Sequence, residues 1–322
     1  MCGTAVKEKA VIINIFEAID RHVPADLRQR VRASLMTPQF GLHHNEGPTL
    51  RSHLELMFSV LGGVRDGIFH RDVPEEIRQI LRDAAKRYEH LLIPYVFLHD
   101  VEKQNCMMFV YPDGETKYPM SLAQWLIIVN EWGCRDDVEF GRRLRAFCME
   151  RGIEQISYYQ ERDGTVHHHG SEAAKFLAGH REVDSLIVRA VGMHEVAFQF
   201  GERGGINIPL FEETFALVNA DGFGYTWTEA ELGFVLLVNY ADQMGSLGRN
   251  GMPDISDFLW LARTYLAAHK YADLLDRLYD EMRLDAHRVK RLTEALRVST
   301  SAFSSETVED ALMRIVEECT II

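Results

Sequence analysis

The sequence predicts an all-α fold with one or two small β-hairpin insertions. Apolar residues recur at helical spacing along most of the chain, as Leu54, Met57, Phe58 and Leu61 do within residues 50–62. Alternation of apolar and polar residues is too rare for a large sheet, and only two short segments resemble hairpins. A chain of 322 residues with a hydrophobic share of 47% can bury a large core without disulfides or structural metals.

The predicted helices have identifiable ends in the first third of the chain. The second begins at Pro24, the third ends at Gly62-Gly63, and the fourth begins after Pro74. In the buried helix that follows, Pro94 predicts a kink or break. The helices are expected at residues 5–22, 24–35, 50–62, 75–90, 91–103, 121–132, 137–151, 171–180, 182–193, 228–245, 255–270, 271–283, 285–297 and 305–318.

The two hairpins are expected at residues 106–120 and 156–169, around Asp113-Gly114 and Asp163-Gly164. We expect three regions: an N-terminal helical extension (1–44), a catalytic core (45–250) and a C-terminal helical extension (251–322). The C-terminal extension is amphipathic and is expected to pack on the core, with a homodimer interface as the alternative.

The charge balance limits the partners. The chain has 35 Lys and Arg against 48 Asp and Glu, a net charge of −13, which argues against a broad surface for long nucleic acid. A small anionic ligand remains compatible, because one pocket can be positive on an acidic protein. The five cysteines form no CxxC pair, there is no signal peptide pattern, and the apolar runs are too short to cross a bilayer. We therefore expect a soluble cytoplasmic protein with free thiols.

Histidines and aspartates recur at core-facing positions of apolar helices. His99-Asp100 ends the most hydrophobic run, which by itself fits either a hydrogen-bonded core pair or a metal site. A single inward histidine such as His53 is by itself best read as a core residue. Six such residues together favour a metal site, since imidazoles and carboxylates are natural ligands of Mn, Fe, Ni, Co and Zn. The candidate ligands are His53, His99, Asp100, His169, His194 and Asp242.

The order of these residues resembles the HD-domain superfamily of metal-dependent phosphohydrolases. The segments that carry the resemblance are RSHLELMFSVL, YVFLHDVEK, HHHGSEAAKFL, LIVRAVGMHE and LLVNYADQMGS, which lie between residues 51 and 246. The resemblance implies an HD-domain helical bundle and one or two divalent ions, either a transition metal or Mg. It implies a first metal on His53, His99, Asp100 and Asp242, and a second on Asp100, His169 and His194, bridged by Asp100.

Two positions have alternatives, and one departs from the family pattern. His70 is the rival of His53, and His168 is the rival of His169 within three consecutive histidines. Where the family usually has Gly in HDxGK, this chain has Glu102, which we expect to alter access or the contacts around the ligands.

The function that the resemblance implies is hydrolysis of a phosphoester by a hydroxide that bridges two metals. Asp100 and Lys103 are the expected catalytic residues, and Arg51, Lys103 and Lys175 are the expected phosphate contacts, although surface charge is the commoner role of Lys and Arg. A nucleotide is the first expected substrate, and a nucleic-acid end the second. The rival hypotheses are a mixed-valent di-iron oxygenase with the same ligand order and a non-catalytic HD regulatory module.

Overall fold

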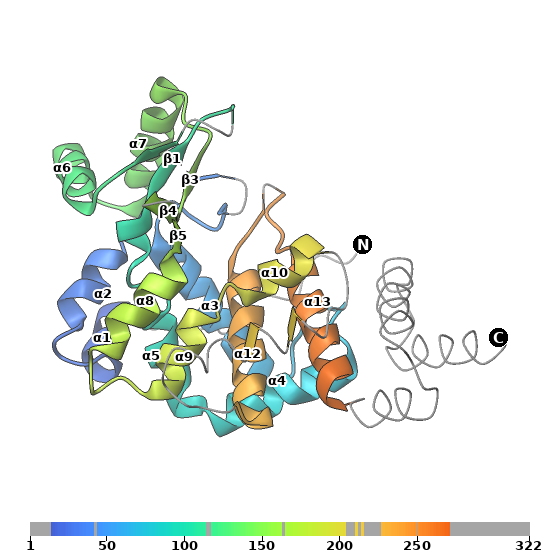
Figure 1. Cartoon of the computed structure of the whole chain (residues 1–322). Coiled ribbons are helices and arrows are strands. Elements are labelled where there is room, and N and C mark those ends of the chain that lie inside the picture. The colour runs from blue at the N-terminus through green and yellow to red at the C-terminus, as the bar shows by residue number, and fades with distance from the viewer. Residues whose placement is uncertain are drawn as a thin grey trace. The chain divides into compact units, whose positions relative to one another are not determined.

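The structure, a computed structural model, confirms a mostly α-helical fold with small β insertions (Figure 1). It describes residues 14–41, 44–113, 117–162, 165–203, 210–211, 214–215, 227–248 and 250–270. The helices predicted within 271–322 lie outside the described residues. Among the described helices, each is too short or too polar to cross a membrane.

The described elements follow the predicted order closely. The helices are α1 (Ile15–His22), α2 (Arg28–Ser34), α3 (Leu50–Arg65), α4 (Glu75–Arg87), α5 (Glu89–Leu98), the 3-10 helix η1 (Lys103–Cys106), α6 (Leu122–Trp132), α7 (Asp137–Arg151), α8 (His169–Ala178), α9 (Ser185–Gly192), α10 (Val196–Arg203), α12 (Glu229–Gly245), α13 (Ser256–Tyr265) and the π-helix η2 (Leu266–Lys270). The strands are β1 (Met108–Val110), β2 (Lys117–Pro119), β3 (Gln155–Ser157), β4 (Tyr159–Arg162) and β5 (Thr165–His168).

The chain divides into two compact units, each formed from two stretches of sequence. The first unit consists of residues 1–194 and 233–254, and the second of residues 195–232 and 255–322. These boundaries differ from the predicted regions 1–44, 45–250 and 251–322, whose roles as extensions and core stay a prediction. In the second unit, α10 packs against α13, and Phe200 and Phe258 are fully buried.

The helical part of the first unit is a bundle in which α3, α5, α8 and α9 pack side by side (Figure 1). Residues 233–245 of α12 complete it. The side-chain amide of Asn239 donates to the Met193 carbonyl oxygen at 3.0 Å, which ties α12 to the end of α9. The apolar faces that drive this packing are buried at helical spacing, as Leu54, Met57 and Leu61 are in α3.

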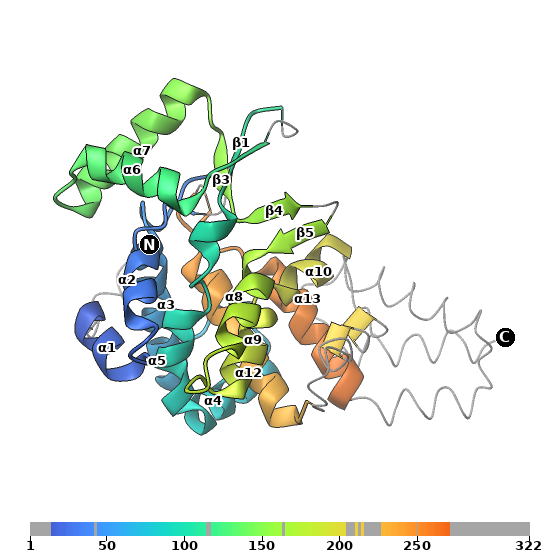
Figure 2. The same ribbon diagram turned by 60° about the vertical axis from the view of Figure 1, so that its left-hand side comes forward.

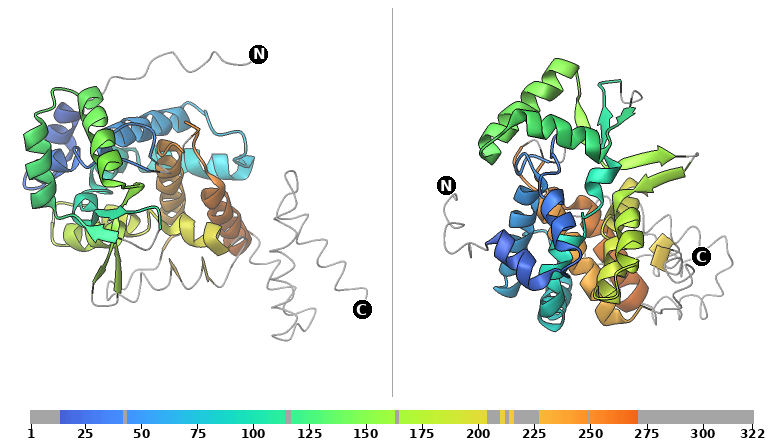
Figure 3. Two further views of the ribbon diagram at one scale, coloured as in Figure 1. Left: turned by 90° about the horizontal axis from the view of Figure 1, so that it is seen from above. Right: turned by 90° about the vertical axis from the view of Figure 1, so that its left-hand side faces the viewer.

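A lobe inserted between α5 and α8 carries the β-strands. Strands β2, β1 and β3 form an antiparallel sheet in that order, in which Phe109 is opposite both Tyr118 and Ile156. Helices α6 and α7 cover this sheet (Figures 2 and 3), and Trp125 of α6 packs with the sheet and α7 in one apolar cluster. The separate hairpin β4–β5 then leads directly into α8.

The prediction that Gly62-Gly63 ends the third helix is wrong, because α3 continues to Arg65. The residue that stops the helix is Gly67, two positions after Arg65, whose φ of +79° is the left-handed conformation that glycine adopts at low cost. The Ile68 amide donates to the Gly63 carbonyl at 2.7 Å, and the Gly67 amide donates to the Val64 carbonyl at 3.1 Å. These two bonds satisfy carbonyls that a helix end leaves open, so the stop signal lies one turn later than predicted.

Two proline predictions also need correction. Pro24 begins a turn closed by the Leu27 amide, which donates to the Pro24 carbonyl at 3.0 Å, and α2 begins only at Arg28. Helix α5 continues through Pro94, so the expected break is absent there and lies instead at Tyr88, between α4 and α5; the alternative, a kink at Pro94, stays a prediction.

The sequence missed one strand pairing and one helix. Strand β3 overlaps the start of the predicted hairpin 156–169, but it pairs with β1, more than 40 residues away, which a local pattern does not reveal. Helix α10 lies where no helix was predicted.

Two glycine substitutions test this account of α3. Gly62→Ala should raise the free energy of unfolding by about 0.5–1 kcal/mol, because the added Cβ meets nothing within 4 Å and alanine restricts the unfolded chain. Gly67→Ala should lower it by about 1 kcal/mol, because alanine resists a positive φ. Urea denaturation measures both changes. Equal effects at the two positions would contradict the placement of the helix end.

Candidate metal centre

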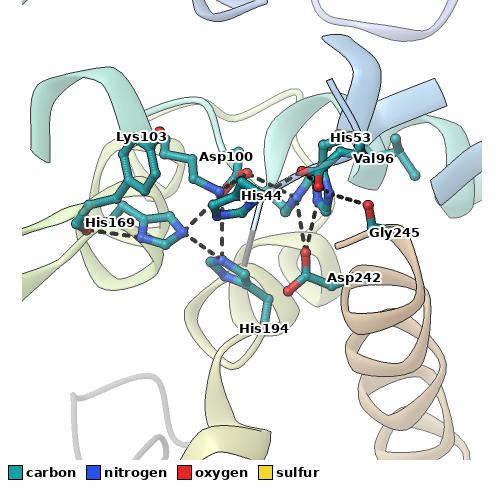
Figure 4. Close-up of polar contacts among 12 residues, drawn as sticks. His44, His53, Val96, Asp100, Lys103, His169, His194, Asp242 and Gly245 are labelled. Atoms are coloured by element: carbon teal, nitrogen blue, oxygen red, sulfur yellow. Dashed lines mark hydrogen bonds and ion pairs between the residues drawn. The ribbon is translucent and has the colours of Figure 1, made fainter. Parts of the chain in front are cut away.

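The six predicted ligands converge on one buried cluster of the first unit (Figure 4). They come from five helices or helix ends that are far apart in the sequence. His53 lies in α3, His99 is the residue that ends α5, Asp100 follows it, His169 is the first residue of α8, His194 follows α9 and Asp242 lies in α12.

One half of the cluster is formed by Asp100, His169 and His194. The Oδ1 atom of Asp100 lies 3.0 Å from His169 Nε2 and 3.7 Å from His194 Nε2. The two Nε2 atoms lie only 3.0 Å apart. All three side chains are buried, so these contacts form away from bulk water.

The other half is formed by His53, His99 and Asp242. The Oδ1 atom of Asp242 lies 3.0 Å from His53 Nε2 and 3.8 Å from His99 Nε2. His99 Nε2 also lies 3.4 Å from Oδ2 of Asp100. Asp100 therefore faces both halves, with one carboxylate oxygen toward each.

All four imidazoles are held in the same way, through Nδ1 and a backbone carbonyl. The Nδ1–O distances are 3.1 Å from His53 to Gly245, 2.9 Å from His99 to Val96, 3.0 Å from His169 to Tyr158 and 2.7 Å from His194 to Val191. A carbonyl oxygen only accepts, so Nδ1 is the protonated nitrogen in each ring. In the neutral ring the lone pair is then on Nε2, which points into the cluster. In His99 and His194 the carbonyl lies three residues earlier, in the last turn of the preceding helix.

This arrangement fits a bound cation. Lone pairs of Nε2 atoms that face each other and face carboxylate oxygens at 3.0–3.8 Å repel one another unless positive charge lies between them. The buried atoms His53 Nε2, His99 Nε2 and Asp100 Oδ1 meet no hydrogen-bond geometry. Imidazole nitrogens whose second nitrogen donates to a carbonyl are typical metal ligands. The groups His53–His99–Asp100 and Asp100–His169–His194 could therefore each hold a metal ion.

The buried charges agree with this reading. Burial by itself raises the pKa of the Asp100 carboxyl, but the ammonium of Lys103 and the neighbouring histidines hold that pKa well below its usual range. Burial likewise raises the pKa of the Asp242 carboxyl, but the contact with His53 and the nearby imidazoles of His194 and His99 lower that pKa overall. Both carboxylates are therefore ionised at neutral pH and available as ligands.

Glycines let two helices approach the imidazole rings. A Cβ at Gly170 would lie 2.6 Å from Cε1 of His194 and 2.8 Å from its Nδ1, distances that real Cβ atoms do not reach. A Cβ at Gly245 would lie 2.8 Å from Met57 Cγ and 3.2 Å from His53 Cε1. Close approach of α8 and α12 to the cluster thus depends on the missing side chains.

Lys103 lies beside the cluster as predicted, and Tyr158 holds it there. The Lys103 ammonium lies 2.9 Å from Asp100 Oδ2 and 4.7 Å from the centre of the Tyr158 ring, and the side chain is only 5% exposed. Tyr158 also accepts both the backbone amide and Nδ1 of His169 at its carbonyl oxygen, and its hydroxyl donates to the Pro38 carbonyl. Tyr158 lies just before β4, so the inserted lobe takes part in building the site.

The other predicted phosphate contacts have partners away from the six candidate ligands. Arg51 is paired with Glu55 at 2.9 Å and Lys175 with Glu172 at 3.0 Å; the Arg51 side chain is half-buried and that of Lys175 is largely exposed. The rival ligands also lie elsewhere. His70 contacts Asp72, and His168 is exposed at the end of β5 with its ring against Tyr159.

Glu102 points away from the cluster. Its Oε1 atom accepts from Nε and Nη2 of Arg30 at 3.1 and 2.6 Å, so it ties the segment after Asp100 to α2.

Sequence reasoning missed His44, Glu46 and Tyr158. Glu46 is completely buried, with Oε1 2.9 Å from His44 Nδ1 and 3.8 Å from His53 Nδ1, and its Oε2 accepts the Leu247 amide at 3.1 Å. The ring of His44 lies edge-on to His53, with centroids 6.3 Å apart. Ligand-type residues two apart, just before the His53 helix, were the available signal. No sequence signal pointed to Tyr158, because it holds His169 through its backbone carbonyl.

Comparisons with protein-family models, with curated proteins and with solved structures found no match. The geometry of the cluster is therefore the basis on which a function is inferred.

Gly170→Ala tests whether metal binding at the cluster requires the close approach of α8 to the His194 ring. The new Cβ must displace the His194 ring, so we expect loss of at least about tenfold in metal affinity, as when a group that orients a ligand is removed. Far-UV circular dichroism should stay unchanged, and titration with Zn²⁺ or Mn²⁺ measures the affinity. Gly62→Ala, which touches nothing, is the control. Equal metal affinity in the two variants would contradict this role of Gly170.

Proposed function

We propose that this protein is a metal-dependent phosphohydrolase that cleaves a phosphoester of a small substrate, with a nucleotide as the first candidate. The observation that carries the proposal is the convergence of four imidazole Nε2 atoms on the ionised carboxylates of Asp100 and Asp242. The buried Lys103 lies beside Asp100. In the overall reaction a water oxygen bonds to phosphorus, the ester P–O bond breaks, and the alcohol leaves with a proton.

The proposed ligand sets follow the two halves of the cluster. One ion is assigned to His53, His99, Asp100 and Asp242, and a second to Asp100, His169 and His194. Divalent ions in such a site lower the pKa of a bound water and offset charge on phosphoryl oxygens. Because most of the donors are imidazole nitrogens, the set favours Mn, Fe, Co, Ni or Zn over Mg, which prefers oxygen.

Lys103 is the proposed contact of the chain with a phosphoryl oxygen. Its ammonium lies at the cluster, 2.9 Å from Asp100, in a setting that is nearly closed to water. Charge that develops on a phosphoryl oxygen is stabilised more strongly by a fixed cation in such a setting than in water. The hydrogen bond to Asp100 and the ring of Tyr158 hold the ammonium in place before substrate binds.

Asp100→Ala tests the centre. We expect the purified protein to contain one or two metal ions per chain by elemental analysis, and to hydrolyse bis(p-nitrophenyl) phosphate or p-nitrophenyl phosphate with added Mn, Co, Ni, Fe or Zn. Loss of the shared ligand should lower metal content and reduce turnover by more than about 100-fold, with helicity retained. Asp83→Ala, on the exposed side of α4, is the matched control.

Three outcomes would contradict the proposal. Metal content near zero would indicate a non-catalytic module. Bound iron with oxygen consumption but no hydrolysis would indicate an oxygenase. Full activity in the Asp100→Ala variant would exclude this cluster as the site.

Lys103→Met separates phosphate contact from metal binding. We expect turnover to fall by about 10²-fold, the usual effect of removing one group that stabilises charge in the transition state. Metal content should not fall, because Lys103 is not a ligand. Lys175→Met removes an exposed lysine whose partner is Glu172 and should leave turnover unchanged. Loss of activity in both variants to the same degree would refute the assignment to Lys103.

A further inference from the structure

A cavity of about 740 Å³ lies in the first unit between α7 and residues 39–41 and 44–48, and it has no role in the proposed function. The volume is within the range of small-molecule sites, about 300–1,000 Å³. We refer to it as the α7 cavity. The lining residues used below are Phe40, His44, Pro48, Arg142, Leu144 and Arg145.

The α7 cavity adjoins the candidate metal centre through His44. This residue lines the cavity, and its ring is edge-on to both His53 and Tyr158, with centroids 6.3 and 6.0 Å apart. The segment that carries His44 is fixed at both ends. The Ile156 amide of β3 donates to the Phe40 carbonyl at 3.0 Å, and the Asn45 amide donates to the Leu247 carbonyl at 2.9 Å. A ligand in the cavity is therefore one imidazole ring away from a ligand of the centre.

Two arginines bring positive charge to the α7 cavity. Arg142 and Arg145 are one turn apart on α7, both are exposed, and neither forms an ion pair with another described residue. The guanidinium group matches phosphate oxygens with two parallel hydrogen bonds. Asp137 and Glu154 also line the cavity, so the positive charge is local to the two arginines. On a chain of net charge −13, such a local site favours an anionic ligand over the surrounding surface.

The remaining wall is apolar. Phe40, Pro48 and Leu144 line the cavity together with Val138 and Met149, which are 77% and 73% exposed. Burial of such surface against an organic group is favourable. The α7 cavity thus combines an apolar wall for a flat organic group with two exposed cations.

We propose that the α7 cavity binds the nucleoside part and a second phosphate of the substrate, with Arg142 and Arg145 on that phosphate. This inference rests on the proposed function, because it places the cleaved phosphoester at the candidate metal centre. It narrows the substrate class to nucleotides with at least two phosphate groups. A free nucleotide that regulates the enzyme has the same chemistry, and the kinetic experiment below separates the two.

Binding to metal-free protein tests the cavity without any turnover. The probes are adenosine and cytidine 3′,5′-bisphosphates and 5′-triphosphates, with the 5′-monophosphates as reference, measured by calorimetry on chelator-treated protein. We expect at least one two-phosphate probe to bind at least about tenfold tighter than its monophosphate. The double variant Arg142→Ala/Arg145→Ala should lose this advantage.

Arg143→Ala is the matched control, because Arg143 is exposed on the same helix but does not line the cavity. It should keep the tenfold advantage. Absence of the advantage in the native protein, or an advantage that the double variant retains, would overturn the inference. Since both substituted arginines are exposed, circular dichroism should be unchanged.

Kinetics of the metal-loaded protein then distinguish substrate from regulator. If the cavity holds part of the substrate, the double variant should raise KM for two-phosphate nucleotides at least about tenfold and leave p-nitrophenyl phosphate hydrolysis within twofold. A nucleotide that changes p-nitrophenyl phosphate turnover without being cleaved would overturn the substrate assignment. Arginine-dependent binding without any phosphoesterase activity would refute the proposed function alone. Activity without arginine-dependent binding would refute the cavity alone.

Discussion

The hydrogen bonds from four imidazole Nδ1 atoms to backbone carbonyls are the constraint on which the centre depends. They set the tautomer and the direction of each ring. Four Nε2 lone pairs are thereby directed into one small volume, which also holds the carboxylates of Asp100 and Asp242. This is a costly arrangement for a protein core, because like partial charges face one another. Its cost is offset only when a cation is present, whether a proton or a metal ion. The contact with Asp242 raises the pKa of His53 although burial lowers it, as expected if a proton serves in place of a metal.

The inserted lobe belongs to the site although it supplies none of the six candidate ligands. Tyr158 connects the lobe to the cluster three times: its carbonyl orients His169, its ring covers the ammonium of Lys103, and its hydroxyl holds Pro38 at the start of the segment that carries His44. Sheet, hairpin and loop are thus fixed relative to the ligands by one residue. Helix α7 of this lobe also lines the α7 cavity. Changes in α7 can therefore alter which ligand the cavity accepts and leave the six candidate metal ligands unchanged.

The sequence was sufficient for the fold class and for the six residues of the cluster, because core-facing histidines and aspartates stand out against apolar helical spacing. It could not choose between His168 and His169, since the choice depends on where β5 ends and α8 begins. Arg51 shows a different limit of sequence reasoning: residues two apart on a helix point in different directions, so closeness to His53 in sequence does not place Arg51 on the same face, and its contact with phosphate stays a prediction. Strand β3 and Tyr158 act through long-range backbone pairing, which leaves no trace in side-chain pattern.

The bond between His53 and Gly245 joins residues 192 positions apart. Closing so large a loop costs chain entropy before any contact is gained, and contacts of this range form late in folding. A nascent chain on the ribosome therefore lacks Asp242, and the Gly245 carbonyl that orients His53, until nearly all of the first unit has been synthesised. Metal binding would then follow folding rather than guide it. A centre that holds metal would indicate a chain in which α3 and the end of α12 are already in contact.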